Sequence, residues 1–250
     1  NFVLYARGVR GNVREFFRNI EVRTLFIWLS ILVVVFSASL FYNEHVEDIF
    51  MVIPRGLFLI ISAATSTGYQ LFSSNQMQQV VTSGATFVVI LAMAIGASSG
   101  STAGGIKAMR LGIMCKASVV QIRRVFLPDN AQVSTVYYHG EKRMLTSSET
   151  NGALVVLSLF CVSMVFGALL GIAYGYDALP AIFESVSAVG DSGLSSGIVS
   201  PTAPRLLMVN YLVQMLLGRL EFLSVLSVLV ALIMSPFPQL RKRKAASREG

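Results

Sequence analysis

The stretch SAVGDSGLSSG, residues 187–197, decides how this sequence folds, because an earlier stretch repeats its pattern. The pattern F-x3-S-A-x4-G begins at residue 58 and again at residue 183, and four matches at one offset are not expected by chance. In each copy an apolar run precedes small polar residues and glycine, which predicts a short helix followed by extended backbone. Pro54 and Pro180 lie near the predicted starts of these helices, where a missing N–H does no harm.

The tetrapeptide GDSG at 190–193 is also the one that carries the nucleophilic serine in chymotrypsin-like proteases, which would make Ser192 a nucleophile. The matching tetrapeptide in the first copy is TSTG, residues 65–68, which fits no protease motif. A serine nucleophile also needs a histidine base. The chain has only His45, in a predicted outer loop, and His139, in a basic linker. We therefore expect no protease, and no enzyme.

The composition is that of a membrane protein. Hydrophobic residues make up 54% of the 250 residues and charged residues only 13%, well outside the usual range of soluble proteins. The runs 24–42, 152–174 and 205–234 are each long enough to cross a hydrocarbon core of about 30 Å as one helix. The run 80–95 is a shorter, fourth candidate.

Positive charge is concentrated in three segments, since 17 of the 20 Lys and Arg residues lie in 1–23, 107–143 and 241–248. The positive-inside rule places these segments in the cytoplasm and leaves the acidic segments 43–50 and 175–178 outside. The RKRK run in the tail then favours a topology anchor or a lipid-headgroup contact over a nucleic-acid patch. We therefore expect membrane lipid as a partner and no nucleic acid.

This topology leaves room for only one full crossing between 24–42 and the basic segment that begins at 107. Residues 80–106 supply that crossing, so the apolar run 51–68 has no room to cross and is predicted to be re-entrant. We therefore predict an all-α membrane protein with two helix–re-entrant pore loop–helix repeats. The second repeat follows the same plan, with a span, a re-entrant segment and a span at 152–174, 179–193 and 205–234.

Irregular backbone at membrane depth is tolerated only where it is buried in protein or lines a watery cavity. A short helix followed by a strand rich in Thr, Ser and Gly suits a cation filter, because glycine allows the backbone to aim carbonyl oxygens at an ion. The helix C-terminus adds partial negative charge. The alternative is a small-residue loop that only packs. The candidate filter residues are Thr65, Ser66, Thr67, Gly68, Val189, Gly190, Asp191, Ser192 and Gly193.

Four segments carry a resemblance to a known family: the loops SAATSTGY and SAVGDSGLSSG, GASSGSTAGGIK at 96–107 and LGRLEFLSVL at 217–226. Together they resemble the Trk/Ktr/HKT superfamily of potassium transporters, most closely its TrkH-like and KtrB-like membrane subunits. RVFLPDN at 124–130 and FFRNIEVR at 16–23 also look like linker segments of that superfamily. The resemblance covers nearly the whole chain.

Members of this superfamily carry four helix–loop–helix repeats around one pore, whereas this chain holds two. The resemblance identifies them as the third and fourth repeats and implies that the missing N-terminal half of the same protein completes the pore. The alternative is that two chains combine to complete it. It also implies a multi-pass position in the plasma (inner) membrane. The implied repeats are the third at 24–115 and the fourth at 147–236. The implied cytoplasmic segments are a linker end at 1–23, a linker at 116–146 and a basic tail at 237–250.

Glycine, serine and threonine crowd the segment 96–107 and predict a break in the helical span near mid-membrane. The segment is no phosphate-binding loop, because Ile106 separates its glycines from Lys107. Close helix packing through a G-x-x-x-G pattern is the alternative. The resemblance implies an intramembrane loop that lies under the filter and gates the pore. The candidate gate residues are Gly96, Gly100, Ser101, Thr102, Gly104, Gly105, Lys107 and, from the last span, Arg219.

Two charged residues fall at membrane depth. Arg219 lies near the centre of the predicted span 205–234, where an arginine is costly unless it faces a cavity or has partners. The resemblance implies that it lies beneath the pore, donates hydrogen bonds to the intramembrane loop and repels cations. Glu221 faces another direction, and a structural tie to another helix stays open for it. Asp191 departs from the superfamily, and its side chain is expected either behind the filter or at the outer mouth.

The resemblance implies potassium transport, with K⁺ at the filter carbonyls and the glycine-rich loop as gate. Gly68 and Gly193 favour potassium, because a serine at the filter glycine of the first repeat goes with sodium preference in the superfamily. A sodium-selective member and a non-conducting membrane scaffold or assembly subunit are the alternatives. The resemblance also implies a homodimer and a cytosolic regulatory subunit that binds any NAD or ATP. No cofactor is therefore expected in this chain.

Overall fold

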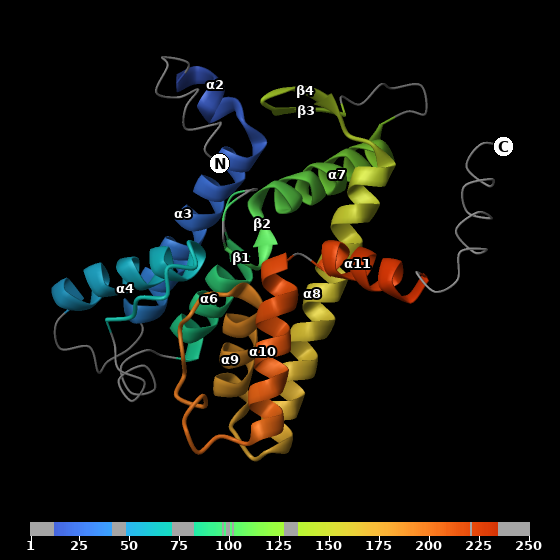
Figure 1. Cartoon of the computed structure of the whole chain (residues 1–250). Helices are drawn as coiled ribbons and strands as arrows, with labels where there is room; N and C mark the ends of the chain where they lie inside the picture. The colour runs from blue at the N-terminus through green and yellow to red at the C-terminus, as the bar shows by residue number, and fades with distance from the viewer. Residues whose placement is uncertain are drawn as a thin grey trace.

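The computed structural model of the chain describes residues 13–41, 49–71, 83–96, 98, 101, 103–127, 135–220 and 222–234. It is mostly helical, as predicted, with two small pairs of strands (Figure 1). The elements in chain order are α2 (Val13–Arg18), α3 (Ile20–Phe41), α4 (Ile49–Ala64), α6 (Ser83–Ala94), β1 (Ile95–Gly96), β2 (Ile106–Lys107), α7 (Ala108–Phe126), β3 (Val136–His139), β4 (Glu141–Met144), α8 (Ser147–Ala173), α9 (Ala178–Gly190), α10 (Arg205–Leu220) and α11 (Phe222–Met234).

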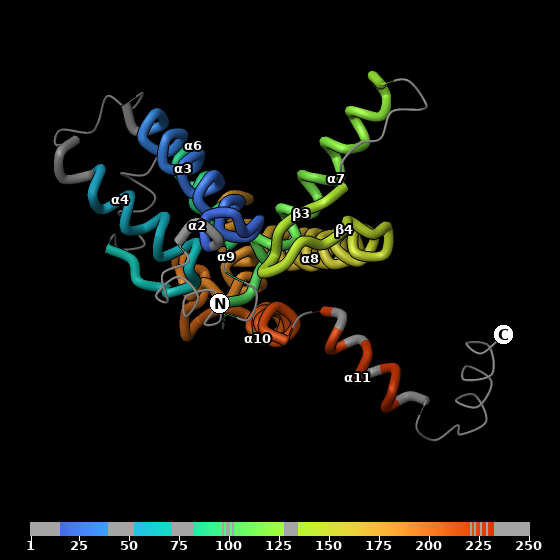
Figure 2. Tube along the Cα trace, turned by 90° about the horizontal axis from the view of Figure 1, so that it is seen from above, coloured from blue at the N-terminus to red at the C-terminus, as the bar shows by residue number. Residues whose placement is uncertain are grey.

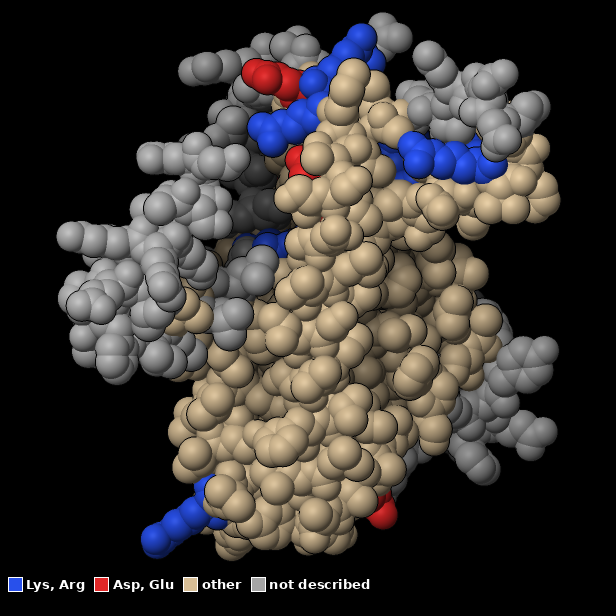
Figure 3. All heavy atoms as spheres, turned by 90° about the vertical axis from the view of Figure 1, so that its right-hand side faces the viewer, with Lys and Arg blue, Asp and Glu red and all other residues tan. Residues whose placement is uncertain are grey.

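Two of the described helices, α3 and α8, are long and apolar enough to cross a membrane. They have 22 and 27 residues, and each lies over one of the runs predicted to span. Many of their apolar side chains face outward, such as Val34 and Val162, each 67% exposed. Figure 3 shows such a face, with charged side chains gathered at its upper end, a few at its lower edge and an almost uncharged surface between. Lipid suits a surface of this kind better than water does.

Two short helices lie where the re-entrant segments are predicted. Helices α4 and α9 have 16 and 13 residues, so at 1.5 Å per residue they reach about 24 and about 20 Å, less than a hydrocarbon core. Helix α9 packs against α8, α10 and α6, and α4 packs against α3 and α6. Helix α9 therefore lies among its neighbours, whereas α4 packs against two helices and lies at the edge of the molecule in Figure 2.

A single apolar core joins the two halves of the chain. Helix α6 packs on one side against α3 and α4 and on the other against α9. The fully buried side chains at these contacts include Leu59, Val89, Met93 and Phe183. In a bilayer such contacts stabilise the helices through van der Waals packing, because lipid chains are as apolar as these side chains. The core fixes the C-terminal ends of the two short helices relative to each other.

The predicted helix break after α6 is present. Helix α6 ends at Ala94, and Ile95 and Gly96 pair in parallel with Ile106 and Lys107 before α7 begins. The indole Nε1 of Trp28, on α3, donates a 3.1 Å hydrogen bond to the carbonyl of Ile95, which satisfies a group that the ended helix leaves free. The described residues between the two strands, 98, 101 and 103–105, are thus not part of a continuous helix.

The predicted single span over 205–234 is wrong. Helix α10 ends at Leu220, and α11 begins at Phe222 and runs in a different direction (Figure 1). Phe222 is buried against Phe160 of α8, with ring centroids 4.7 Å apart in an edge-to-face arrangement. This contact anchors the start of α11 on α8. Arg219 accordingly lies in the last turn of a helix and not at the centre of one.

The position predicted for Pro54 is also wrong. Helix α4 begins at Ile49, two residues before the predicted re-entrant segment 51–68, which makes Pro54 its sixth residue. A proline there removes the hydrogen bond that its N–H would donate to the carbonyl four residues before. Pro180 is the third residue of α9, within the first turn where no such bond exists, as predicted.

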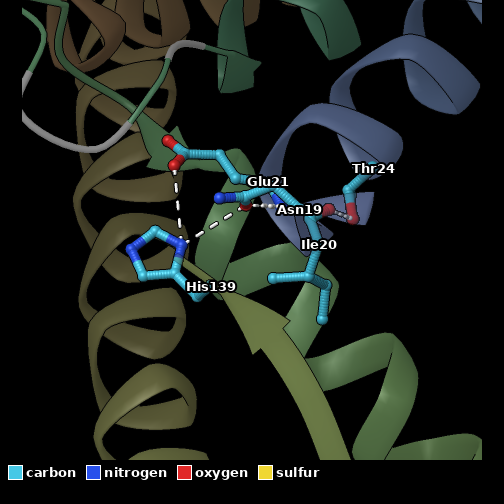
Figure 4. Close-up of polar contacts among 5 residues, drawn as sticks. All are labelled: Asn19, Ile20, Glu21, Thr24 and His139. Atoms are coloured by element: carbon cyan, nitrogen blue, oxygen red, sulfur yellow. Dashed lines mark hydrogen bonds and ion pairs between the residues drawn. The ribbon is translucent and has the colours of Figure 1, made fainter. Parts of the chain in front are cut away.

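The sequence analysis missed a β-hairpin in the predicted cytoplasmic linker. Strands β3 and β4 pair in antiparallel register across Gly140, whose φ of 72° suits glycine. The hairpin lies beside α3 at the top of Figure 1, and Figure 4 shows His139 at its tip beside Asn19 and Glu21. The β-forming run VYYH before a glycine was the available signal.

Candidate functional site

The two loops that follow α4 and α9 have the same backbone conformation. Ser66 and Asp191 both adopt the left-handed region, at φ 51° and 50°, and Gly68 and Gly193 do so at φ 80° and 79°. Left-handed backbone costs a residue with a Cβ roughly 1–2 kcal/mol. The two loops therefore share one backbone conformation at equivalent positions, as the sequence repeat predicts.

One serine in each short helix ties the following loop back to that helix. The hydroxyl of Ser62 donates to the carbonyl of Tyr69 at 2.7 Å, and the hydroxyl of Ser187 donates to the carbonyl of Leu194 at 2.5 Å. The carbonyls of the same two serines accept equivalent backbone bonds, both of 3.0 Å, from the N–H groups of Thr67 and Ser192. The serine of the repeated pattern therefore fixes the path of the loop backbone.

The two loops contact each other at their glycines. A Cβ on Gly68 would lie 2.8 Å from the carbonyl oxygen of Ser192 and 3.3 Å from the Cα of Gly193. The hydroxyl of Ser66 donates a 3.1 Å hydrogen bond to the carbonyl of Gly190. The structure thus brings together the predicted filter residues of both repeats, and only glycine fits where the backbones meet.

The predicted gate loop packs against the C-terminal ends of both short helices. A Cβ on Gly96 would overlap the carbonyl oxygen of Ala64, the last residue of α4. A Cβ on Gly104 would lie 2.9 Å from the carbonyl oxygen of Gly190, the last residue of α9. Glycine at these two positions therefore allows the loop to approach the helix ends closely.

The other predicted gate residues are placed as follows. Gly105 has a φ of 78°, and Lys107 lies in β2. The hydroxyl of Ser101 is buried and has no hydrogen-bond partner among the described residues. Gly100 and Thr102 lie outside the described residues.

The side chain of Asp191 faces the gate loop. Its Oδ2 is buried, has no hydrogen-bond partner within the described part of the chain, and lies 2.8 Å from the position that a Cβ on Gly104 would take. The guanidinium of Arg219 is close enough to attract it electrostatically. Of the two orientations that the sequence left open, the carboxylate therefore takes the one behind the loop backbone, toward Gly104.

Arg219 reaches this region because α10 packs tightly on the end of α9. A Cβ on Gly218 would overlap the carbonyl oxygen of Val189. The Arg219 side chain follows directly and is exposed in this chain. Glu221, its predicted neighbour, lies outside the described residues. The candidate site thus combines the ends of α4, α9 and α10 with the gate loop.

A buried carboxylate that the sequence analysis missed supports the second loop. Glu184 is 3% exposed and accepts hydrogen bonds from the Ser195 hydroxyl at 2.8 Å, the Ser196 N–H at 2.8 Å and the Ser196 hydroxyl at 2.9 Å. Three donors offset the cost of burying a charge. The first repeat has Leu59 at the equivalent position. The signal was a lone glutamate within the apolar run of α9.

Two further kinds of site are not supported. Ser192 is 1% exposed, and His139 lies on the hairpin, 3.9 Å from the carboxylate of Glu21 (Figure 4), so the two cannot form a catalytic pair. Within the described residues there is no group of three His, Cys, Asp or Glu side chains that could hold a metal ion.

Comparison with known proteins matches this chain to transporters. The sequence model of the TrkH family, described as "Cation transport protein", matches residues 10–242. An uncharacterized cation transporter of Methanocaldococcus jannaschii is 31% identical over 74% of this chain and 38% of its own length. The Trk system potassium uptake protein TrkI of Halomonas elongata is 30% identical over 91% of this chain and 46% of its own length. The chain thus spans less than half the length of these relatives.

A solved structure has the same fold. The crystal structure of the potassium transporter TrkH from Vibrio parahaemolyticus superposes with a TM-score of 0.74 over 92% of this chain and 48% of that protein. The two sequences are 21% identical in this comparison. The Trk system potassium uptake protein TrkH of Escherichia coli is 26% identical over 90% of this chain.

Proposed function

The chain belongs to the TrkH family of cation transport proteins, and on that premise we propose that it forms part of a path along which potassium ions cross the membrane. It is a membrane protein whose named relatives are transporters and not enzymes. The relatives from Halomonas elongata and Escherichia coli are potassium uptake proteins by name. Potassium is accordingly the proposed transported ion.

The matched backbone of the two loops is the observation that carries this proposal. An ion filter replaces the hydration shell with carbonyl oxygens that several loops present in the same way around one axis. Ser66 and Asp191 share one conformation, and so do Gly68 and Gly193. A scaffold that only packs has no need of equal, costly conformations in two loops. The proposed filter therefore consists of residues 65–68 and 189–193.

Two loops do not complete a ring of carbonyls. The chain spans 46% of the length of its Halomonas elongata relative. We propose that the remaining half of the same polypeptide supplies two further loops. In that arrangement this chain holds the third and fourth repeats, at 24–115 and 147–236, and the basic segments 1–23, 116–146 and 237–250 face the cytoplasm of the plasma (inner) membrane.

The gate loop is proposed to close the path below the filter. It is held there by close contact of Gly96 and Gly104 with the C-terminal ends of α4 and α9. Asp191 and Arg219 add opposite charges at the same place. Opening requires the loop to leave these contacts. Helix α7 begins directly after the loop, at Ala108, so movement of α7 would pull the loop away from these contacts and open the path.

A cytosolic regulatory subunit is proposed to move α7. The helix is followed by the hairpin β3–β4, and both carry basic residues on the proposed cytoplasmic side. Any NAD or ATP would bind to that subunit and not to this chain. The complete protein is proposed to form a homodimer with one pore in each protomer.

Uptake of Rb⁺ by bacteria that lack other potassium uptake systems tests the proposal. The complete protein that contains this chain should take up Rb⁺, and K⁺ should compete with it more strongly than Na⁺ does. Stronger competition by Na⁺ would identify a sodium-selective transporter instead. Absence of uptake, together with equal thermal stabilisation of the purified protein by K⁺, Na⁺ and Li⁺, would support the scaffold alternative.

A further inference from the structure

A basic pocket lies at the N-terminal end of α3, on the proposed cytoplasmic side. It has a volume of about 420 Å³ and is lined by residues of α2, α3, α7 and the hairpin β3–β4. We call it the basic pocket and define it by its charged and aromatic side chains, which are Arg18, Arg23, Lys116, Lys142, Tyr137 and Tyr138. It is separate from the loops of the candidate site, which lie at the ends of α4 and α9.

The basic pocket has an excess of positive charge. Four cationic side chains line it, and no Asp or Glu is among its described lining residues. The nearby carboxylates are directed elsewhere. Glu149 accepts a hydrogen bond from the Tyr137 hydroxyl at 3.1 Å, and Glu21 faces His139 (Figure 4). An anion in the pocket would therefore meet four cations and no carboxylate among the described residues that line it.

Two of the cations are held in place by the protein. The ammonium of Lys116 donates a hydrogen bond to the carbonyl of Val136, and the guanidinium of Arg18 lies 5.4 Å from the ring centroid of Tyr138. Burial and, to a smaller extent, the charge of Arg23 lower the pKa of Lys116. A bound anion would relieve this unfavourable environment. The side chains are thus ordered before any ligand arrives.

The position of the basic pocket selects the kind of anion. Ile27, which lines it, is 56% exposed and belongs to the apolar part of α3 that is long enough to cross the membrane. The pocket therefore joins a basic wall to a surface that suits acyl chains. Basic pockets between membrane helices on the cytoplasmic side are suited to anionic lipid headgroups.

We propose that the basic pocket binds the phosphate group of an anionic phospholipid of the cytoplasmic leaflet. The phosphate oxygens accept hydrogen bonds from the Arg and Lys side chains, and the acyl chains lie along Ile27 and the apolar face of α3. The bound lipid would join α3 to α7 and to the hairpin. No bond is made or broken in this binding.

Native mass spectrometry of the complete protein in a non-ionic detergent tests this. Phosphatidylglycerol and phosphatidylcholine with the same acyl chains are added in turn, and the lipid retained by each protomer is counted. The double variant R23Q/K116Q should bind phosphatidylglycerol at least tenfold more weakly, because it loses two charge-assisted contacts. Retention of phosphatidylcholine should not change. The matched control R123Q/R124Q removes two charges from the exposed end of the same helix and should bind like the wild type.

Further arms separate the sources of phosphate and the effects of folding. Inorganic phosphate and glycerol 3-phosphate are added to the wild type, and each should compete only weakly with the lipid. If the double variant fails to fold, the milder variant K142Q, on an exposed strand, takes its place in the test. It should weaken phosphatidylglycerol binding by a smaller factor.

Four outcomes would overturn the proposal. The first two are equal retention of both lipids by the wild type, and a loss of phosphatidylglycerol binding in R123Q/R124Q equal to that in R23Q/K116Q. The third is free phosphate that binds as tightly as the lipid. The fourth is loss of regulatory-subunit binding in R23Q/K116Q with unchanged lipid retention.

Discussion

The hydroxyl of Ser66 donates a hydrogen bond to the carbonyl of Gly190, 124 residues later in the chain, and so links the loop of one repeat to the helix end of the other. The carbonyl that accepts it belongs to a residue of the proposed filter. A second link runs between the same loops, because the N–H of Ser195 donates to the side-chain oxygen of Gln70 at 3.4 Å. A change in one loop is therefore expected to alter the other.

We predict that Gly68→Ser weakens discrimination between K⁺ and Na⁺. At φ 80° a residue with a Cβ is strained by roughly 1–2 kcal/mol, and that Cβ would also lie 2.8 Å from the Ser192 carbonyl oxygen. Gly193→Ser should act in the same direction but less strongly, because its nearest neighbour would be 3.3 Å away. Competition of Na⁺ with Rb⁺ uptake measures the effect.

Gly152→Ser is the matched control for this prediction. A Cβ there has nothing within 4 Å, and the residue lies in α8 away from both loops. Its selectivity should equal that of the wild type. Unchanged selectivity in both loop variants would remove Gly68 and Gly193 from the filter.

We predict that Gly104→Ala favours the open gate. The added methyl group would lie 2.8 Å from the carboxylate of Asp191 and 2.9 Å from the carbonyl oxygen of Gly190, so the loop must move away from the end of α9. Ion flux per folded protein should rise and depend less on the regulatory subunit. A fall in flux, with thermal stability unchanged, would mean that the loop does not block the path.

We predict that Arg219→Ala raises flux. If the guanidinium holds the gate loop and repels cations, its loss removes charge-assisted hydrogen bonds worth about 1.5–3 kcal/mol each. That energy corresponds to a shift of the gate equilibrium by roughly ten- to a hundredfold. The measurement is K⁺ flux divided by the amount of folded protein, and a clear decrease would contradict the gate role.

Two further variants test where Arg219 acts. Arg205→Ala removes a charge from the exposed first turn of the same helix and should leave flux unchanged. Asp191→Asn keeps the side-chain shape but removes its charge. If the two opposite charges act as a pair, the double variant R219A/D191N should show less than the sum of the single effects.

We predict that Glu184→Leu destabilises the protein, although it reproduces the residue of the first repeat. The substitution leaves the buried N–H of Ser196 and the half-buried hydroxyl of Ser195 without their acceptor, whereas the Ser196 hydroxyl keeps the carbonyl of Pro180. A buried donor without a partner costs about 1–3 kcal/mol. Glu184→Gln should be milder because it keeps one acceptor oxygen. Thermal unfolding in detergent measures both variants. Thr202→Ala, at an exposed position of the same loop, is the control and should unfold at the wild-type temperature.

Local sequence was sufficient to predict the two loops and the helix break. The conformation after each short helix depends on a serine and a glycine within seven residues of each other, and the break depends on a cluster of glycines. Such signals are read directly from the chain, because turn and helix preferences act over a few residues.

Features that depend on distant contacts were not predictable. The start of α11 packs through Phe222 on Phe160, 62 residues earlier in the chain, and no local sequence signal shows that contact. Glu184 was visible as a charge, but the loop that supplies its three donors could not be known. The orientation of Asp191 likewise depends on Gly104, from another repeat.

The hydrogen bond from Trp28 to the carbonyl of Ile95 has a spectroscopic consequence. Trp28 is the only tryptophan of this chain, and its indole N–H is bonded to the first residue after α6, where the gate loop begins. Displacement of that loop would break the bond and change the polarity around the indole. The intrinsic emission spectrum of this chain is therefore a label-free optical reporter of loop displacement, recorded at an excitation wavelength that its eight tyrosines do not absorb.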